Sequence, residues 1–220
     1  MKKRMALYII LGVVILLAVA AVLWFGGLFS LSRQFELRNG IHFGEKIDTV
    51  ISKETLTQKS VNDERTTVVY EGTVAGYDNT EVYFSFDGKN NGLDELLYWF
   101  VPHSQSECDS QYNALFENLQ MKYGTPLSES DPRASLYQGN ATKELTAKVD
   151  FFRNYLGKRG EIRNSAGWLI EKGGECIKIE IVSCQVMGNY AYDFEIRISY
   201  TYFSKDAIKE SLENGVGKDL

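Results

Sequence analysis

The first segment of the chain contains no charged side chain over residues 5–29, which read MALYIILGVVILLAVAAVLWFGGLF. A helix needs about 20 apolar residues to cross the hydrocarbon core of a bilayer, so this run predicts a transmembrane helix. The basic residues Lys2, Lys3 and Arg4 predict that tail 1–4 stays in the cytoplasm and that the rest of the chain lies outside it. A cleaved signal peptide with its small residues at Ala18–Ala20 is the competing interpretation. It is less favoured because the segment that follows is still apolar.

Beyond a short linker at 30–39, the pattern predicts two sets of three strands. Alternating or continuous apolar runs place strands at 66–75, 81–87 and 93–101, and then at 162–171, 175–186 and 190–203. The glycine- and asparagine-rich segment 88–92 predicts a hairpin loop between the second and third strands. In the last strand, apolar side chains on one face alternate with polar side chains on the other, which is typical of a sheet with one buried face.

Helical spacing recurs in three places. Apolar residues spaced by three or four positions predict a short helix around 47–51, a longer one over 108–123 and another over 142–156. The order indicates an α+β fold with helices packed on antiparallel β-meanders, and it suits a duplicated helix-plus-three-strand unit. We expect one extracytoplasmic domain over 40–204, with halves 40–104 and 105–204, followed by a C-terminal tail at 205–220. The two sets of strands could form one continuous sheet or two small ones.

Two segments resemble a known family. Gly40-Ile41-His42-Phe43-Gly44, followed by Ile47-Asp48-Thr49-Val50-Ile51, resembles the helix-opening pattern of SmpA/OmlA outer-membrane assembly lipoproteins and the β-lactamase-inhibitor-like α+β module. Tyr123-Gly124-Thr125-Pro126 is similar to the helix ending of such modules. The resemblance implies a protein–protein interaction module of a bacterial envelope. The chain departs from the lipoproteins because it has an apolar anchor in place of a lipidated cysteine and an insertion between Thr125 and Thr142.

Composition narrows the classes of function. The chain has 29 acidic and 24 basic residues, a formal net charge of −5, and three of the basic residues precede the apolar run. An acidic domain is a poor match for nucleic acid, because binding to nucleic acid depends on neutralising phosphates. The three cysteines, Cys108, Cys176 and Cys184, cannot all pair with one another, so we expect buried free thiols or one bridge from Cys108 to either of the others.

The sequence carries no signature of catalysis or of a cofactor. Its two histidines, His42 and His103, have no partner at metal-ligand spacing, and there is no Cys-x-x-Cys, P-loop, Gly-x-Ser-x-Gly or dinucleotide fingerprint. We therefore predict that the protein is not an enzyme and holds no metal or cofactor. An unrecognised hydrolase would instead need a cleft with convergent carboxylates or histidines.

The segment Leu93–Val101 is the most suggestive for function, because both of its faces are apolar. A strand in a sheet with one wet face should carry polar residues on one side. Either other elements cover both faces, or one face binds a partner through aromatic side chains, which are favoured at interfaces. The candidate partner-binding residues are Tyr83, Tyr98, Trp99 and Phe100. We therefore expect a membrane-anchored, non-enzymatic module that binds another envelope protein; the alternative is an inhibitor or small-ligand binder on the same fold.

Overall fold

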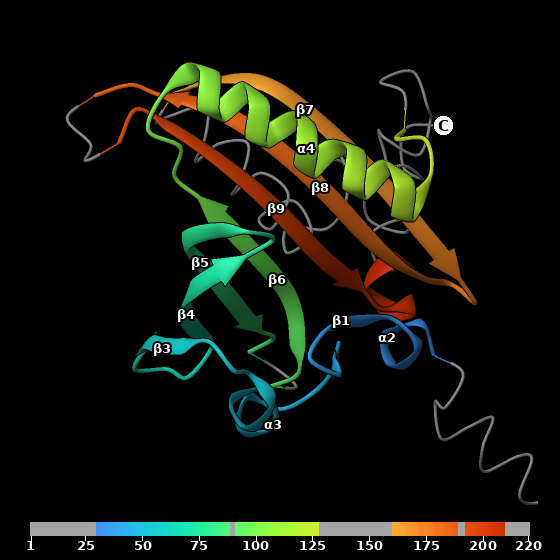
Figure 1. The fold of residues 1–220 in the computed structure, drawn as a ribbon. Coiled ribbons are helices and arrows are strands. Elements are labelled where there is room, and N and C mark those ends of the chain that lie inside the picture. Colours follow the sequence, from blue (N-terminus) through green and yellow to red (C-terminus); the bar gives the residue numbers. More distant parts are fainter. Residues whose placement is uncertain (1–29, 89–90, 128–159, 189–191, 210–220) are drawn as a thin grey trace, which may run out of the picture.

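The computed structural model describes residues 30–88, 91–127, 160–188 and 192–209, and strands dominate these ranges (Figure 1). Seven strands form one antiparallel sheet in the order β3-β4-β5-β6-β9-β8-β7. The strands are β3 Thr57–Val61, β4 Thr67–Val74, β5 Tyr77–Phe86, β6 Leu93–Phe100, β7 Gly160–Lys172, β8 Glu175–Val186 and β9 Phe194–Phe203. The two sets of strands expected from the sequence therefore merge into one continuous sheet, joined where β6 pairs with β9.

Tight turns set the antiparallel order within each set. Gly173 and Gly174, between β7 and β8, both have positive φ angles, 61° and 85°. Two-residue hairpins with this backbone twist match the twist of the flanking strands, and glycine adopts it without steric cost. The loop between β5 and β6 closes through the Asp87 amide, which donates to the Gly92 carbonyl over 2.9 Å. The hairpin predicted at 88–92 is thus confirmed.

One face of the sheet, called here the first face, packs against helix α4 and against the elements that precede β3. Helix α4, Gln105–Tyr123, lies across β7, β8 and β9, whereas α2 (Leu31–Gln34), β1 (Glu36–Arg38), β2 (Ile41–His42) and α3 (Ile47–Lys53) gather at the other end of the sheet (Figure 1). These elements share one hydrophobic core with the strands. Its most deeply buried side chains include Ile41, Phe43, Tyr70, Phe84, Leu93, Leu96, Ile177, Ile179, Ile181 and Ile196. The second face is the opposite side of the same strands.

The α+β class predicted from the sequence is wrong for the described residues, which are mostly strand. The physical reason is that both meanders share one sheet and that β3, whose residues show no apolar alternation, extends this sheet by pairing with β4. The helix predicted over 142–156 and most of tail 205–220 lie outside the described residues. Helix 108–123 is confirmed, and it begins slightly earlier, at Gln105.

The membrane prediction is also corrected. Among the residues that the structure describes, no helix combines the length and the apolar character needed to span a bilayer. The predicted transmembrane segment 5–29 itself lies outside the described ranges. We therefore do not retain the single-pass anchor, the membrane localisation or the extracytoplasmic placement that were inferred from that segment.

Candidate aromatic interaction surface

The strand alternation divides the four candidate residues between the two faces of the sheet. Tyr98 lies opposite Val82 on β5 and Ile198 on β9, both of which belong to the core, so it is on the first face. Phe100, two residues further on, shares this face and is only 2% exposed. Trp99 lies opposite Glu81 and Arg197, on the second face. Tyr83, two positions from Glu81 along β5, shares that face.

Tyr83 and Trp99 form an aromatic cluster with a third ring, that of Tyr192. The ring centroids of Tyr83 and Trp99 are 6.1 Å apart with an interplanar angle of 41°. Tyr192, in the segment between β8 and β9, approaches Trp99 edge-on, with centroids 5.5 Å apart and planes at 77°. Tilted and edge-to-face pairs at these distances are favourable arrangements for aromatic rings. All three side chains are partly exposed, and we call Tyr83, Trp99 and Tyr192 the aromatic patch.

Charged side chains from β3, β4 and β5 lie beside Tyr83. The Tyr83 hydroxyl donates a hydrogen bond to the carboxylate of Glu81. Lys59 forms ion pairs with Glu81 and with Glu71, the latter over 3.0 Å, so one ammonium serves two carboxylates. The hydrogen bonds that Lys59 donates to Glu81 and Glu71 raise the pKa of Lys59, and burial together with the bond to Glu81 raises the pKa of Tyr83. Both groups therefore keep their protons at neutral pH.

A buried ion pair supports the other side of Trp99. An Arg197 guanidinium nitrogen lies 3.1 Å from a carboxylate oxygen of Glu195, and the two side chains are only 7% and 1% exposed. The guanidinium carbon also lies 5.1 Å from the centroid of the Trp99 ring, within the range of a cation–π contact. The indole nitrogen of Trp99 is buried and has no hydrogen-bond partner among the described residues. Ring contacts, rather than a hydrogen bond, therefore hold the indole in place.

Tyr98 and Phe100 have a packing role on the first face. Their rings stack with centroids 6.5 Å apart, and Tyr98 also meets Tyr200 edge-on at 6.2 Å. Burial raises the pKa of Tyr98 to about 12, against the opposing effect of the nearby Arg38. These two residues, proposed from the sequence as partner-binding, are not brought together with Tyr83 and Trp99.

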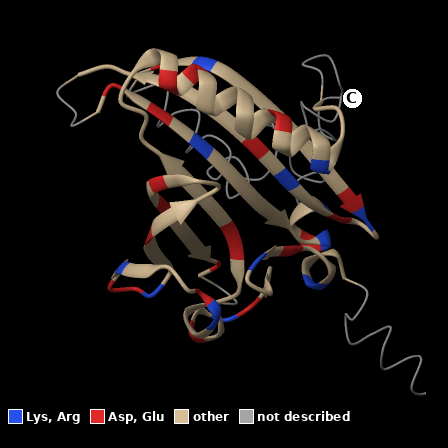
Figure 2. Cartoon of the chain, in the orientation of Figure 1, with Lys and Arg blue, Asp and Glu red and all other residues tan. Residues whose placement is uncertain are grey.

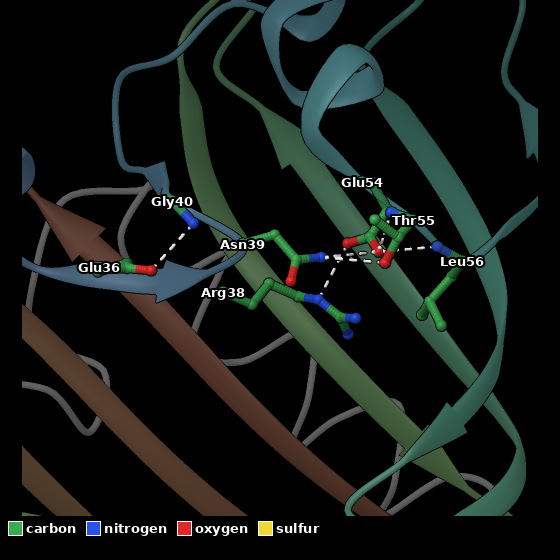
Figure 3. A network of polar contacts seen from close by, with 7 residues as sticks. All are labelled: Glu36, Arg38, Asn39, Gly40, Glu54, Thr55 and Leu56. Atoms are coloured by element: carbon green, nitrogen blue, oxygen red, sulfur yellow. Dashed lines mark hydrogen bonds and ion pairs between the residues drawn. The ribbon is translucent and has the colours of Figure 1, made fainter.

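Arg38 belongs to a polar network that ties the β1–β2 hairpin to the end of α3 (Figure 3). Its guanidinium Nε lies 2.9 Å from a carboxylate oxygen of Glu54, whose side chain is completely buried. The other oxygen of Glu54 accepts hydrogen bonds from the amides of Thr55 and Leu56, at 2.8 and 3.0 Å, and from the Asn39 side chain at 3.2 Å. Because this carboxylate is satisfied within the protein, the network is best explained as structural.

Sequence reasoning found two members of the aromatic patch and missed Tyr192, Arg197 and Glu195. Tyr83 and Trp99 were both named as candidates, but because both faces of Leu93–Val101 are apolar, the sequence did not say on which face Trp99 lies. No local signal pairs Trp99 with Arg197, because β9 lies far along the chain and the pairing depends on the whole sheet. Tyr192 was missed for the same reason. It comes just before β9, and it reaches Trp99 only because β9 pairs with β6.

The described residues offer little other chemistry. Within them there is no group of three or more histidine, cysteine, aspartate or glutamate side chains placed to hold a metal ion. Cys108, Cys176 and Cys184 are all buried and none takes part in a disulfide, so the bridge from Cys108 that the sequence left open does not form. Burial raises the pKa of both Cys108 and Cys184 to about 11, which keeps these thiols protonated and weakly nucleophilic.

Comparisons with protein-family models, with curated proteins and with solved structures gave no match. The resemblance to the SmpA/OmlA lipoproteins and the β-lactamase-inhibitor-like module therefore stays a prediction.

Proposed function

We propose that this protein is a non-enzymatic interaction module that binds another protein through the aromatic patch. The observation that carries the proposal is the grouping of Tyr83, Trp99 and Tyr192, all partly exposed, on the second face of the sheet. Tyrosine and tryptophan are enriched among the residues that dominate binding energy at protein interfaces. Their rings give a large apolar contact area, and their polar atoms allow them to remain partly in water.

The ion pairs around the patch also suit an interface. A typical interface has an apolar centre surrounded by a polar rim. Here the Lys59–Glu71–Glu81 group provides a polar rim beside Tyr83 and fixes its position in advance. The buried Glu195–Arg197 pair is not part of this rim, but it holds Trp99 in position. Side chains that are already held in position lose less conformational entropy on binding. Prearranged rings on the side of a sheet are therefore better suited to a protein than to a small molecule that needs an enclosed pocket.

The proposal is tested by affinity purification of the tagged chain from cells of its native host. The double variant Tyr83→Ala/Trp99→Ala removes two rings of the patch and is expected to lose a partner that the unmodified chain retains. Met121→Ala is the matched control, because Met121 is 78% exposed on α4, on the other face of the sheet. Circular dichroism and thermal unfolding establish that each variant is folded.

A second variant guards against loss of binding through unfolding. Ser85→Arg adds a long side chain on the second face, two residues from Tyr83, without removing any ring. It should also weaken retention of the partner. The proposal fails if the same partner survives both patch variants, or if Met121→Ala abolishes retention as completely as they do.

A further inference from the structure

The charge around the aromatic patch indicates what kind of partner it fits. Figure 2 shows acidic and basic residues interspersed over most of the described elements, with no large region of a single sign. The local balance therefore depends on individual groups. Among the ion pairs that the described residues form beside Tyr83, the carboxylates of Glu71 and Glu81 share the ammonium of Lys59, so this group of three carries one negative charge in excess. The Glu195–Arg197 pair on the other side of Trp99 is neutral as a unit.

The aromatic rings, like the excess carboxylate, favour a positively charged ligand. The face of an aromatic ring carries partial negative charge, and tryptophan attracts cations more strongly than tyrosine or phenylalanine does. Within this molecule, the Trp99 ring already accepts the guanidinium of Arg197 at 5.1 Å. A cation that approaches the exposed part of the patch would therefore meet rings and an excess carboxylate together. An acidic group would be repelled by both, and the chain's net charge of −5 adds to that repulsion at long range.

We propose that the aromatic patch binds a segment of the partner protein that carries arginine or lysine side chains. The inference rests on the proposed function and specifies the chemistry of its partner. Arginine suits the site best, because its planar guanidinium can stack on a ring and direct N–H groups toward a carboxylate. Glu81 is well placed to accept such a bond, since its side chain is 18% exposed. It lies opposite Trp99 on the neighbouring strand and two residues from Tyr83 on its own.

In the test, each of two blocked nine-residue peptides, (Arg-Gly-Ser)₃ and (Glu-Gly-Ser)₃, is added to the whole chain. The tryptophans of the chain carry an isotope label, so that their indole resonances can be followed by NMR. The indole resonance of Trp99, identified with the Trp99→Phe variant, reports on the patch. We expect the arginine peptide to shift this resonance saturably and to bind more weakly as ionic strength rises, because partly exposed charges are screened by salt. The glutamate peptide should leave the resonance unchanged.

Removing both carboxylates turns the excess of one negative charge into one positive charge on Lys59, and it should weaken binding of the arginine peptide by about threefold, the size expected for a partly exposed ion pair. The variant for this is Glu71→Gln/Glu81→Gln. The matched control, Glu117→Gln/Asp206→Asn, makes the same change in net charge at two exposed positions away from the patch and should bind like the unmodified chain. Comparable weakening in both double variants would overturn the inference, because it would show an effect of overall charge only.

Failure of this inference can be told apart from failure of the proposed function. Equal binding of both peptides, or no shift of the Trp99 resonance with either, overturns the basic partner. If the Tyr83→Ala/Trp99→Ala variant still loses a purified partner in that case, the interaction surface stands and only its charge preference is wrong. If that partner also remains bound to Glu71→Gln/Glu81→Gln with unchanged affinity, the partner makes apolar contacts alone.

Discussion

Glu54 places a carboxylate in a position completely shielded from water, between the end of α3 and the β1–β2 hairpin (Figure 3). A charge in such a position is costly unless hydrogen bonds and an opposite charge compensate it. Here two backbone amides, the Asn39 amide group and the Arg38 guanidinium do so. Arg38 in turn lies over the ring of Tyr98, with 5.9 Å to its centroid, so the network positions the hairpin against the sheet.

Replacing Glu54 by alanine should therefore destabilise the protein strongly. We expect the free energy of unfolding to fall by about 3 kcal/mol, because Arg38 and two backbone amides lose their acceptor in a buried position. Asp48→Asn is the matched control, since Asp48 pairs with Arg65 but its side chain is 85% exposed. That change should stay within about 0.5 kcal/mol. Urea unfolding followed by circular dichroism measures the free energy of unfolding of both variants. Equal losses would show that the buried network stabilises the protein no more than the exposed ion pair does.

At the scale of elements, α4 has well-defined ends. The Ser104 hydroxyl accepts a hydrogen bond from the Glu107 amide at 3.2 Å, while the Glu107 carboxylate accepts one from the His103 amide at 2.8 Å. This exchange satisfies amides that have no partner inside the helix. At the other end, Gly124 has a φ angle of 82°, and its carbonyl accepts a hydrogen bond from the Trp168 indole at 2.7 Å. The helix is thus fixed to β7 where it ends.

Ser104→Ala should lower the free energy of unfolding by about 1 kcal/mol, the usual cost of losing a helix cap. Ser106→Ala is the control, because Ser106 is exposed within the first turn and has no capping bond. That substitution should be neutral or slightly stabilising, since alanine favours helix. Chemical unfolding curves of the two variants compared with the unmodified chain give the answer. A loss no greater than that of the control would mean that the first turn of α4 is held by packing alone.

The elements with a strong local pattern were those that the sequence predicted well. β6, the β5–β6 hairpin and α4 each have an apolar period or a turn signal of their own. β3 was missed because its five residues, TQKSV, are almost all exposed and polar, and only pairing with β4 makes them a strand. The aromatic patch was only partly predicted for the same reason: Tyr83 and Trp99 were among the candidates, but their common face and the contact with Tyr192 depend on long-range strand pairing.

At the scale of the whole molecule, one sheet supports both the core and the proposed binding surface. Tyr200 in β9 contacts Phe35, Tyr98 and Tyr123 through its ring, so the N-terminal elements, β6 and α4 all meet over the central strands. On the other side of the same strands lie Trp99 and Arg197. Loss of packing at the centre of the first face should therefore also disturb the aromatic patch on the second.

The buried tyrosines of this core predict a loss of stability at alkaline pH. Burial raises the pKa of Tyr98, Tyr112 and Tyr202 to about 12, whereas tyrosine in an unfolded chain titrates near pH 10. Between these values the unfolded chain releases protons that the folded chain retains, so rising pH favours unfolding. Below about pH 9, these tyrosines should not change the free energy of unfolding. From about pH 10 to about pH 12, the free energy of unfolding should fall progressively.

Urea unfolding at a series of pH values measures this fall, and absorbance at 295 nm reports tyrosinate in the same samples. Tyrosinate should appear together with loss of structure rather than before it. Tyr112→Phe keeps a ring of similar size but removes one raised titration, so it should make the fall shallower, whereas a change at an exposed residue such as Asn113→Ala should not. A free energy of unfolding that stays level to pH 12, or tyrosines that all ionise near pH 10 in the folded chain, would contradict the burial of these hydroxyls. The core on the first face would then be open to water, and its coupling to the aromatic patch would have no structural basis.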